Sequence, residues 1–398
     1  MIRHLFKLIW NRKGSNFLMI VEIFFSFIIL FGVITLGIFF YQNYKKPLGF
    51  NYEHVLVLNV QAHDVPAAEK REGLEQIVNR LSAFEEVQHV AVGSENGPYS
   101  YNTWSTGLTR KNKEIISNMV VVQHDAFKEV LQLQMAEGRW FNESDAFSDA
   151  KPIIITRDAK NQLFGDEPAI GGKVSFGSTR EKQNDVRTVI GVVEAYKPRG
   201  EMGEQSYSYF LRTSLADTSQ QAHSTIYVRL KEGTPPVIEE ALLDAAEAIG
   251  RGWTFNLRQM TDMRTTYLKQ SLIPSSALFI VCVFLILNVA LGLFGVLWQS
   301  INKRYSEIGL RRALGASAGD IYRQFMGEIL VLATFGLILG FFFAVQLPIL
   351  GLFGFTTATY LSAIAIAALL IYGLVLACAL YPSRQAAAIH PAIALHEE

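Results

Sequence analysis

The chain has 398 residues, half of them hydrophobic, and its formal net charge is zero. This length allows two or three domains, the hydrophobic share points to a membrane protein, and the neutral balance argues against a nucleic-acid partner. The charges are nevertheless unevenly spread. Residues 1–16 and 299–326 are strongly basic, whereas 45–270 is mixed and slightly acidic.

Four long apolar runs predict transmembrane helices in contact with lipid, at 17–41, 274–298, 329–348 and 360–381. Each is close to the roughly 20 residues that a helix needs to cross the hydrocarbon core. The first run could instead be a cleavable signal peptide, but such a segment has an apolar region of only about 7–15 residues and ends at small residues. Because this run is longer and ends in tyrosine and polar residues, we expect a retained helix.

The distribution of lysine and arginine predicts the orientation. Basic residues in short flanking loops mark the cytoplasmic side, here 1–16, 299–326 and the tail 382–398. Four spans of a cell inner membrane then place 45–270 and 350–359 outside. The segment 1–16 is either an amphipathic helix at the cytoplasmic interface or a plain basic flank.

The external domain, 45–270, shows one pattern twice. A β-rich run at 55–60 is followed by helical spacing at 74–81 and a second run at 87–92; the same order recurs at 225–230, 237–249 and 253–257. We expect two β-α-β units that form a stalk, with 99–223 inserted as a distal lobe. The lobe predicts strands at 118–123, 152–156, 173–176 and 187–193, and a short helix at 125–132. The predicted fold class is an α+β membrane protein.

An enzymatic role has little support. Gly315-Ala316-Ser317-Ala318-Gly319 matches the G-x-S-x-G nucleophile elbow, and Asp320 and His390 follow in the hydrolase order. That elbow needs a buried strand turning sharply into a helix, whereas the preceding residues predict a basic cytoplasmic helix. The sequence also lacks a G-x-x-x-x-G-K-[ST] phosphate-binding loop and any zinc-ligand spacing. We therefore expect no catalytic residue, metal or bound cofactor.

Two acids and two glycines stand out in the apolar runs. An acid inside a span marks an ion or proton site by default. Glu22 and Glu328, however, lie near the cytoplasmic ends of their helices, where they can reach headgroups or the basic loop, and we favour this interfacial interpretation. Gly336 and Gly340 form a small-xxx-small pattern, which permits close helix packing within the chain or between two copies.

The basic segment 299–326 is the most informative stretch. It contains a helix-compatible sequence with an acid near its start, two arginines further on and an apolar set at Ile308, Leu310 and Leu314. An ordinary positive-inside loop is the alternative. We predict that the segment presents a rigid surface to a partner on the cytoplasmic side.

The stretch from Arg304 to Ser317 resembles the MacB and FtsX family of ABC-transporter permeases, whose form is close to R-x-x-E-I-G-L-R-R-A-L-G-A-S. The tail 381–387, with His390-Pro391 and Ala394-Leu395, is similar to the family's closing pattern. In the external domain, 138–141, 163–165, 170–173 and 189–193 look like the GR-x-F, LFG, IG-x-x and VIGVV landmarks of the MacB-like periplasmic core.

The resemblance implies that two permeases pair, as two copies or as paralogues, and that each contacts an ATPase subunit, which binds the ATP. The implied ATPase-coupling residues are Arg304, Glu307, Ile308, Leu310, Arg311 and Arg312. MacB carries its ATPase before the first helix, whereas only 16 residues precede that helix here. We therefore expect the ATPase on a separate polypeptide, with ATP binding and hydrolysis moving the external domain (mechanotransmission).

These expectations favour a permease subunit that exports a periplasmic or membrane-extracted cargo, with a periplasmic adaptor and an outer-membrane channel as further candidate partners. A signalling subunit that controls a periplasmic partner such as a cell-wall hydrolase is the alternative, and an ion-coupled carrier is a third. The large external domain favours export. The lobe carries no signature of a particular cargo.

Overall fold

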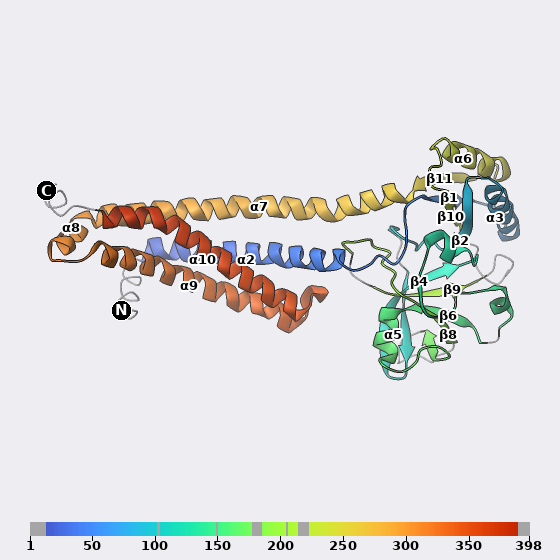
Figure 1. Cartoon of the computed structure of the whole chain (residues 1–398), viewed down its shortest axis with the longest axis horizontal. Helices are drawn as coiled ribbons and strands as arrows, with labels where there is room; N and C mark the ends of the chain where they lie inside the picture. The colour runs from blue at the N-terminus through green and yellow to red at the C-terminus, as the bar shows by residue number, and fades with distance from the viewer. Residues whose placement is uncertain are drawn as a thin grey trace. The chain divides into compact units, whose positions relative to one another are not determined.

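The computed structural model describes residues 13–101, 104–148, 150–176, 185–203, 206–213 and 223–388. The chain divides into two compact units: Met1–Tyr41 with Leu272–Glu398, here called the helical unit, and Gln42–Ser271, here called the external domain. Their elements are labelled in Figure 1. The predicted interfacial segment 1–16 lies almost entirely outside the described residues, as do His390-Pro391 and Ala394-Leu395.

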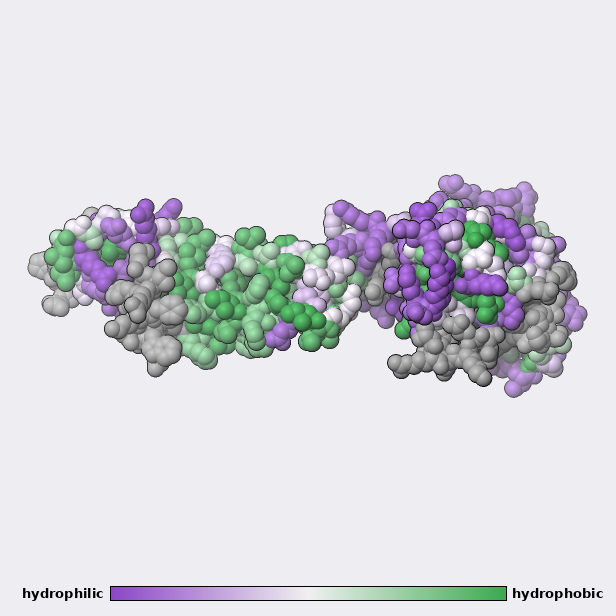
Figure 2. Space-filling view, turned by 90° about the horizontal axis from the view of Figure 1, so that it is seen from below, coloured by the Kyte–Doolittle hydropathy of each residue, from purple (hydrophilic) through white to green (hydrophobic). Residues whose placement is uncertain are grey.

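Within the described part of the chain, four helices are long and apolar enough to cross a membrane. They are α2 (Lys13–Tyr44), α7 (Met260–Lys303), α9 (Ala318–Leu350) and α10 (Thr357–Ala387); the short helices α8 (Tyr305–Ala313) and η2 (Leu352–Gly354) lie between them. Figure 2 shows that the helical unit is mostly hydrophobic on the face seen, whereas the external domain is mostly hydrophilic. With the mixed domain between the first and second long helices, the predicted fold class is confirmed.

Glycines permit the close helix contacts inside the helical unit. A Cβ added to Gly336 would lie 2.8 Å from Ile23 Cγ2, and one added to Gly340 would lie 2.3 Å from Phe27 Cδ1. The small-xxx-small face of α9 therefore packs against α2 of the same chain. Likewise, a Cβ on Gly292 would lie 2.8 Å from Glu22 Oε2, so this carboxylate occupies the space that a side chain on α7 would fill.

The two β-α-β units of the external domain share one sheet. They comprise β1 (Val55–Gln61), α3 (Ala67–Ser82) and β2 (Val87–Gly93), and β10 (Thr225–Leu230), α6 (Ile238–Ile249) and β11 (Thr254–Gln259). The strand order is β11-β1-β10-β2 and every pair is antiparallel, so each unit contributes alternate strands. Helices α3 and α6 contact each other and cover one face. This interleaving is the split β-α-β arrangement of ferredoxin-like domains.

Six of the remaining strands form a closed ring in the order β4-β3-β7-β8-β6-β9, and β9 pairs back with β4 in parallel. The members are β3 (Ser105–Arg110), β4 (Lys113–Val122), β6 (Pro152–Thr156), β7 (Lys173–Phe176), β8 (Val186–Val193) and β9 (Tyr207–Arg212). Helix α5 (Arg157–Phe164) contacts five of these strands and buries Ala159, Leu163 and Phe164. Closure leaves the ring without a free edge. The sequence predicted neither β3, β9 nor α5.

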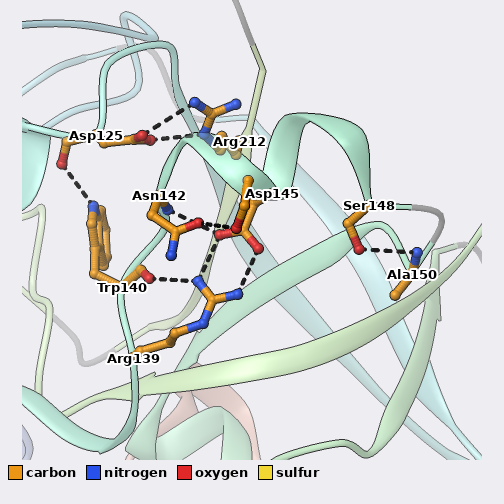
Figure 3. A network of polar contacts seen from close by, with 9 residues as sticks. Asp125, Arg139, Trp140, Asn142, Asp145, Ser148, Ala150 and Arg212 are labelled. Atoms are coloured by element: carbon orange, nitrogen blue, oxygen red, sulfur yellow. Dashed lines mark hydrogen bonds and ion pairs between the residues drawn. The ribbon is translucent and has the colours of Figure 1, made fainter.

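The GR-x-F landmark forms a polar network near helix α4 (Phe127–Leu131) and the short helix η1 (Glu143–Phe147) (Figure 3). Arg139 Nη1 and Nη2 donate to the two carboxylate oxygens of Asp145 at 2.7 and 2.6 Å. Asp145 also accepts from the backbone N–H of Asn142 at 2.9 Å, and Trp140 Nε1 donates to the carbonyl of Asp125 at 2.9 Å. The hydrogen bond from Arg139 holds the pKa of Asp145 below its usual value.

The other landmarks touch one another in pairs. Gly138, in β5 (Met135–Gly138), lies opposite Gly191 of β8. A Cβ on Gly138 would meet the Ile190 carbonyl oxygen at 2.2 Å, so the two strands approach closely only because these residues are glycines. A Cβ on Gly172 would lie 2.4 Å from the Phe164 ring. The IG-x-x turn therefore also packs closely against the LFG sequence at the end of α5 only because this residue is glycine.

Buried charges hold the chain where it enters and leaves the external domain. Lys197 is fully buried, and its Nζ donates to the carbonyls of Asn43 at 2.8 Å and Glu201 at 3.0 Å. Burial lowers the pKa of Lys197 to about 8. Arg264, in the first turns of α7, donates from Nε to Glu201 Oε1 at 2.5 Å and lies 4.7 Å above the Tyr52 ring.

Candidate functional site

The segment predicted to meet a partner consists of helix α8 and the turn that joins it to α9. Arg304 has φ −113° and ψ 19°, which ends α7 and begins α8. After α8, Gly315 takes φ +97°, a conformation that favours glycine, and reverses the chain. Ser317 Oγ then accepts from the Asp320 N–H at 3.2 Å, while the Asp320 carboxylate accepts from the Ser317 N–H at 3.1 Å. This capping box starts α9.

The capping box also explains the G-x-S-x-G match. The Ser317 hydroxyl donates to Asp320 Oδ2 at 2.6 Å and is occupied at the helix start. Helix α8, rather than a strand, precedes it. The described residues at this site therefore have the geometry of a helix N-terminus and lack that of a nucleophile elbow. His390 lies outside the described residues.

The inner face of α8 is apolar and packs within the chain. Ile308 is only 3% exposed and belongs to a small cluster with Ile301, Ile321, Phe325 and Ala386, from α7, α9 and α10. We expected Ile308 to fill a groove on the partner. In the structure Ile308 packs against α7, α9 and α10 of its own chain.

A buried ion pair holds the start of α8. Arg304 Nη1 donates to both carboxylate oxygens of Glu328 at 3.0 Å, and the two side chains are 8% and 15% exposed. The guanidinium also lies 5.9 Å from the centre of the Phe325 ring. Arg304, another of the implied coupling residues, thus pairs within its own chain. Glu328, an acid near the cytoplasmic end of α9, pairs with the basic segment.

A second, more exposed network continues along α8. Arg311 donates to Glu307 Oε1 at 2.5 Å, one helical turn away, and to Gln324 Oε1 at 2.7 Å. Gln324 Nε2 in turn donates to Glu328 Oε1 at 3.1 Å. Gln324 was not predicted as a site residue; its position four residues before Glu328 on one helix was the available signal. The network ties one side of α8 to α9.

The outward face of α8 is what remains for a partner. Leu310 is 51% exposed and Leu314 is 80% exposed, and Glu307 and Arg311 are about half exposed beside them. Of the six expected coupling residues, Glu307, Leu310 and Arg311 therefore lie at this surface, Arg304 and Ile308 are buried, and Arg312 is half-buried. Leu314, noted as part of the apolar set, joins the surface.

The segment offers an exposed surface, and the cavity among its side chains is small. A cavity lined by Arg304, Ile308, Gln324 and their neighbours has a volume of about 10 Å³, barely enough for one water molecule. Among the described residues, no group of three or more His, Cys, Asp or Glu side chains could hold a metal ion. Its exposed leucines and charges suit contact with another macromolecule.

Two family models match the chain. Residues 17–245 match the MacB-like periplasmic core domain, more than half of the 398 residues, and residues 279–391 match the FtsX-like permease C-terminal domain. The chain belongs to the MacB and FtsX family of ABC-transporter permeases. The resemblance found in the sequence is thus confirmed, and the chain is a multi-pass membrane protein with a periplasmic domain.

Curated relatives are longer proteins. The macrolide export ATP-binding/permease protein MacB of Chromobacterium violaceum is 28% identical over 233 residues, covering 57% of this chain and 34% of that protein. The MacB protein of Pasteurella multocida is 28% identical over 295 residues, covering 69% and 42%. The chain therefore spans less than half the length of these relatives. Both family matches on this chain are to permease domains.

Solved structures of external domains are also similar. The periplasmic region of MacB from Actinobacillus actinomycetemcomitans has 18% identity and a TM-score of 0.39, covering 56% of this chain and 97% of that one. The extracellular domain of the noncanonic ABC-type transporter YknZ from Gram-positive bacteria has 16% identity and a TM-score of 0.36, covering 51% and 99%.

Proposed function

We propose that this chain is the permease subunit of a transporter in which a separate ATPase docks on α8 and moves the periplasmic domain, extruding a periplasmic or membrane-extracted cargo. Two permeases, as copies or paralogues, would pair around an ATPase dimer in the inner membrane. An adaptor and an outer-membrane channel are further candidate partners. ATP would bind to the ATPase.

The observation that carries the proposal is the construction of α8. Its inner face is fixed by Ile308 and by the pair between Arg304 and Glu328, whereas Leu310 and Leu314 stay exposed one turn apart. Exposed apolar side chains ringed by charges are typical of a protein contact. A rigidly mounted helix can pass a displacement to the helices that hold it.

The path outward would be α7. This helix runs as one element from Met260, next to the last strand of the periplasmic domain, to Lys303 at the start of α8, with Pro274 inside it. An ATPase dimer that closes on ATP biases the permease only if it contacts two states of the permease differently. A docked α8 provides such a contact, since its position depends on the helices around it.

Co-purification tests the proposal. Changing Leu310 and Leu314 together to serine removes the exposed apolar pair and leaves Ile308 and the ion pair in place. We expect this variant to insert and elute as the wild type but to lose the ATPase. Val237→Ser, a matched change of an exposed apolar residue in the periplasmic domain, should retain it. Undiminished ATPase recovery with the double variant would overturn the docking assignment.

Charge reversal is a second test of the same surface. Arg311→Glu with Arg312→Glu places acids where the helix carries cations, and ATPase association should fall. Because residues 279–391 match an FtsX-like permease domain, control of a periplasmic partner such as a cell-wall hydrolase is the alternative function. Identification of the proteins that co-purify separates the two: an adaptor and channel favour export, and a cell-wall hydrolase favours signalling.

A further inference from the structure

The periplasmic domain contains an open groove on one face of its four-stranded sheet, here called the sheet-face groove. Its floor includes Asn59, Thr225, Asn256 and Arg258, and its wall includes Tyr101 and Asp262. The volume is about 550 Å³, within the range of roughly 300–1,000 Å³ typical of ligand sites. All lining residues lie between Val57 and Thr266, so the groove belongs to this domain alone.

The floor is a row of polar side chains. Asn256, Asn59 and Thr225 lie directly opposite one another on β11, β1 and β10. Thr225 Oγ1 donates to Asn59 Oδ1 at 3.1 Å, which orients the amide. The alternate residues of these strands, such as Leu58 and Ile226, point to the face covered by α3 and α6. Thr225 is buried beneath this row, whereas Asn59 is half-buried and Asn256 is exposed. A side-chain amide both donates and accepts, so these two residues can bind groups of either kind.

Three charged side chains line the groove: Arg258, Asp262 and Glu95. Arg258 and Asp262 are exposed, and neither belongs to an ion pair among the described residues. Arg258 donates from Nε only to Asn256 Oδ1, at 2.9 Å. A ligand that carries both an acidic and a basic group would complement this pair.

The wall formed by loop 94–101 is rigid. Asn96 Nδ2 donates to the carbonyls of Trp104 and Met119 at 3.1 and 2.7 Å, and the Tyr227 hydroxyl donates to the Ser94 carbonyl at 3.0 Å. Outside these anchors, Tyr101 stays 60% exposed. The loop is rich in Ser, Asn, Gly and Tyr, the residues that antibody loops use to bind proteins. A wall held in place before binding lowers the entropic cost of binding.

We propose that the sheet-face groove binds an extended segment of polypeptide. Strand β11 ends the sheet and, among the described residues, pairs only with β1, so its outer edge presents backbone N–H and C=O groups. A polypeptide laid beside such an edge bonds to these groups through its own backbone while its side chains enter the groove. This edge favours a polypeptide over a saccharide. The inference is independent of ATPase docking on α8.

The test uses the full chain in detergent, without any ATPase. A fluorescein-labelled pool of random nonapeptides with blocked ends is titrated and followed by anisotropy, with chitotetraose as the saccharide competitor. We expect saturable peptide binding that weakens at least tenfold when Arg258→Ala and Asp262→Ala are combined. The control variant, Arg251→Ala with Glu247→Ala, loses one positive and one negative charge at exposed sites outside the groove. It should bind peptide as the wild type does.

Tyr101→Ala provides an independent variant, and it should also weaken peptide binding. Elution and circular dichroism matching those of the wild type show that each variant is folded. Three results would overturn the proposal: no saturable peptide binding, equal binding by the charge variant and its control, or binding of chitotetraose that displaces peptide from the wild type.

Discussion

The ion pair between Arg304 and Glu328 gives the sharpest mutational prediction, because α8 depends on it. Both N–O distances are 3.0 Å and the side chains are 8% and 15% exposed. Removing one partner of such a pair leaves an uncompensated buried charge and costs about 3–5 kcal/mol. Because 1.4 kcal/mol is a factor of ten, even about 3 kcal/mol lowers the ratio of packed to released α8 by roughly a hundredfold. Arg304→Glu should therefore release α8.

Trypsin reports this release, since Arg311 and Arg312 become cleavable when the helix opens. We expect faster cleavage of Arg304→Glu in detergent and loss of ATPase recovery. Combining it with Glu328→Arg restores the opposite charges and should return both readouts toward the wild type. Lys303→Glu reverses an exposed neighbouring charge and should change neither. Wild-type cleavage of Arg304→Glu, or no recovery in the double variant, would refute the reasoning.

Three further predictions concern stability. Gly340→Leu should lower thermal stability by about 1–3 kcal/mol through overpacking, with partial recovery on adding Phe27→Ala, which makes room for the new side chain. Asp145→Asn should cost about 2 kcal/mol at pH 7 and progressively less as pH falls below 3.8, because Arg139 lowers the folded pKa of Asp145 and the gain is lost as pH falls toward that lowered value. Unfolding measured against pH should show stability rising between about pH 8 and 10.5. Burial lowers the pKa of Lys197 from 10.5 to about 8, so in this window the unfolded chain binds a proton that the folded chain does not. Lys197→Met should remove the rise, and a rise that persists in this variant would belong to another group.

Apolar runs and periodicity predicted the central part of the fold. Strands β1 and β10 are apolar runs buried on both faces, and helices α3 and α6 carry apolar residues at helical spacing. The interleaving of the two units was not predicted, because it depends on strand pairing between segments far apart in the chain. Strands β3 and β9 were missed, because β3 is rich in Ser, Thr and Gly and β9 alternates Tyr and Ser. Their stability comes from closure of the ring, which local sequence does not encode.

Helix α5 shows the same limit. Its eight residues contain only three buried apolar side chains, Ala159, Leu163 and Phe164, so its periodic signal is short. Contact with five strands of the ring stabilises it. Tertiary packing of this kind outweighs helix propensity.

The sequence indicated the segment of the candidate site, but it did not distinguish the inner and outer faces of α8. The motif placed Ile308 and Leu310 together as docking residues, although two positions along a helix point in different directions. Only the positions of α9 and α10 decide that Ile308 is buried and Leu310 exposed. Arg304 was assigned to the partner for the same reason. The carboxylate with which it pairs belongs to Glu328, 24 residues further along the chain on α9.

Site-specific cross-linking tests the central claim, that the ATPase docks on the outward face of α8. Leu314→Cys, in a chain whose Cys282 and Cys378 are changed to alanine, is labelled with a benzophenone maleimide and irradiated in the assembled complex. The account predicts a covalent adduct with the ATPase from this position and none from the same label on Glu247→Cys in the periplasmic domain. An ATPase that co-purifies yet never cross-links from position 314, or that cross-links equally from both positions, would contradict it.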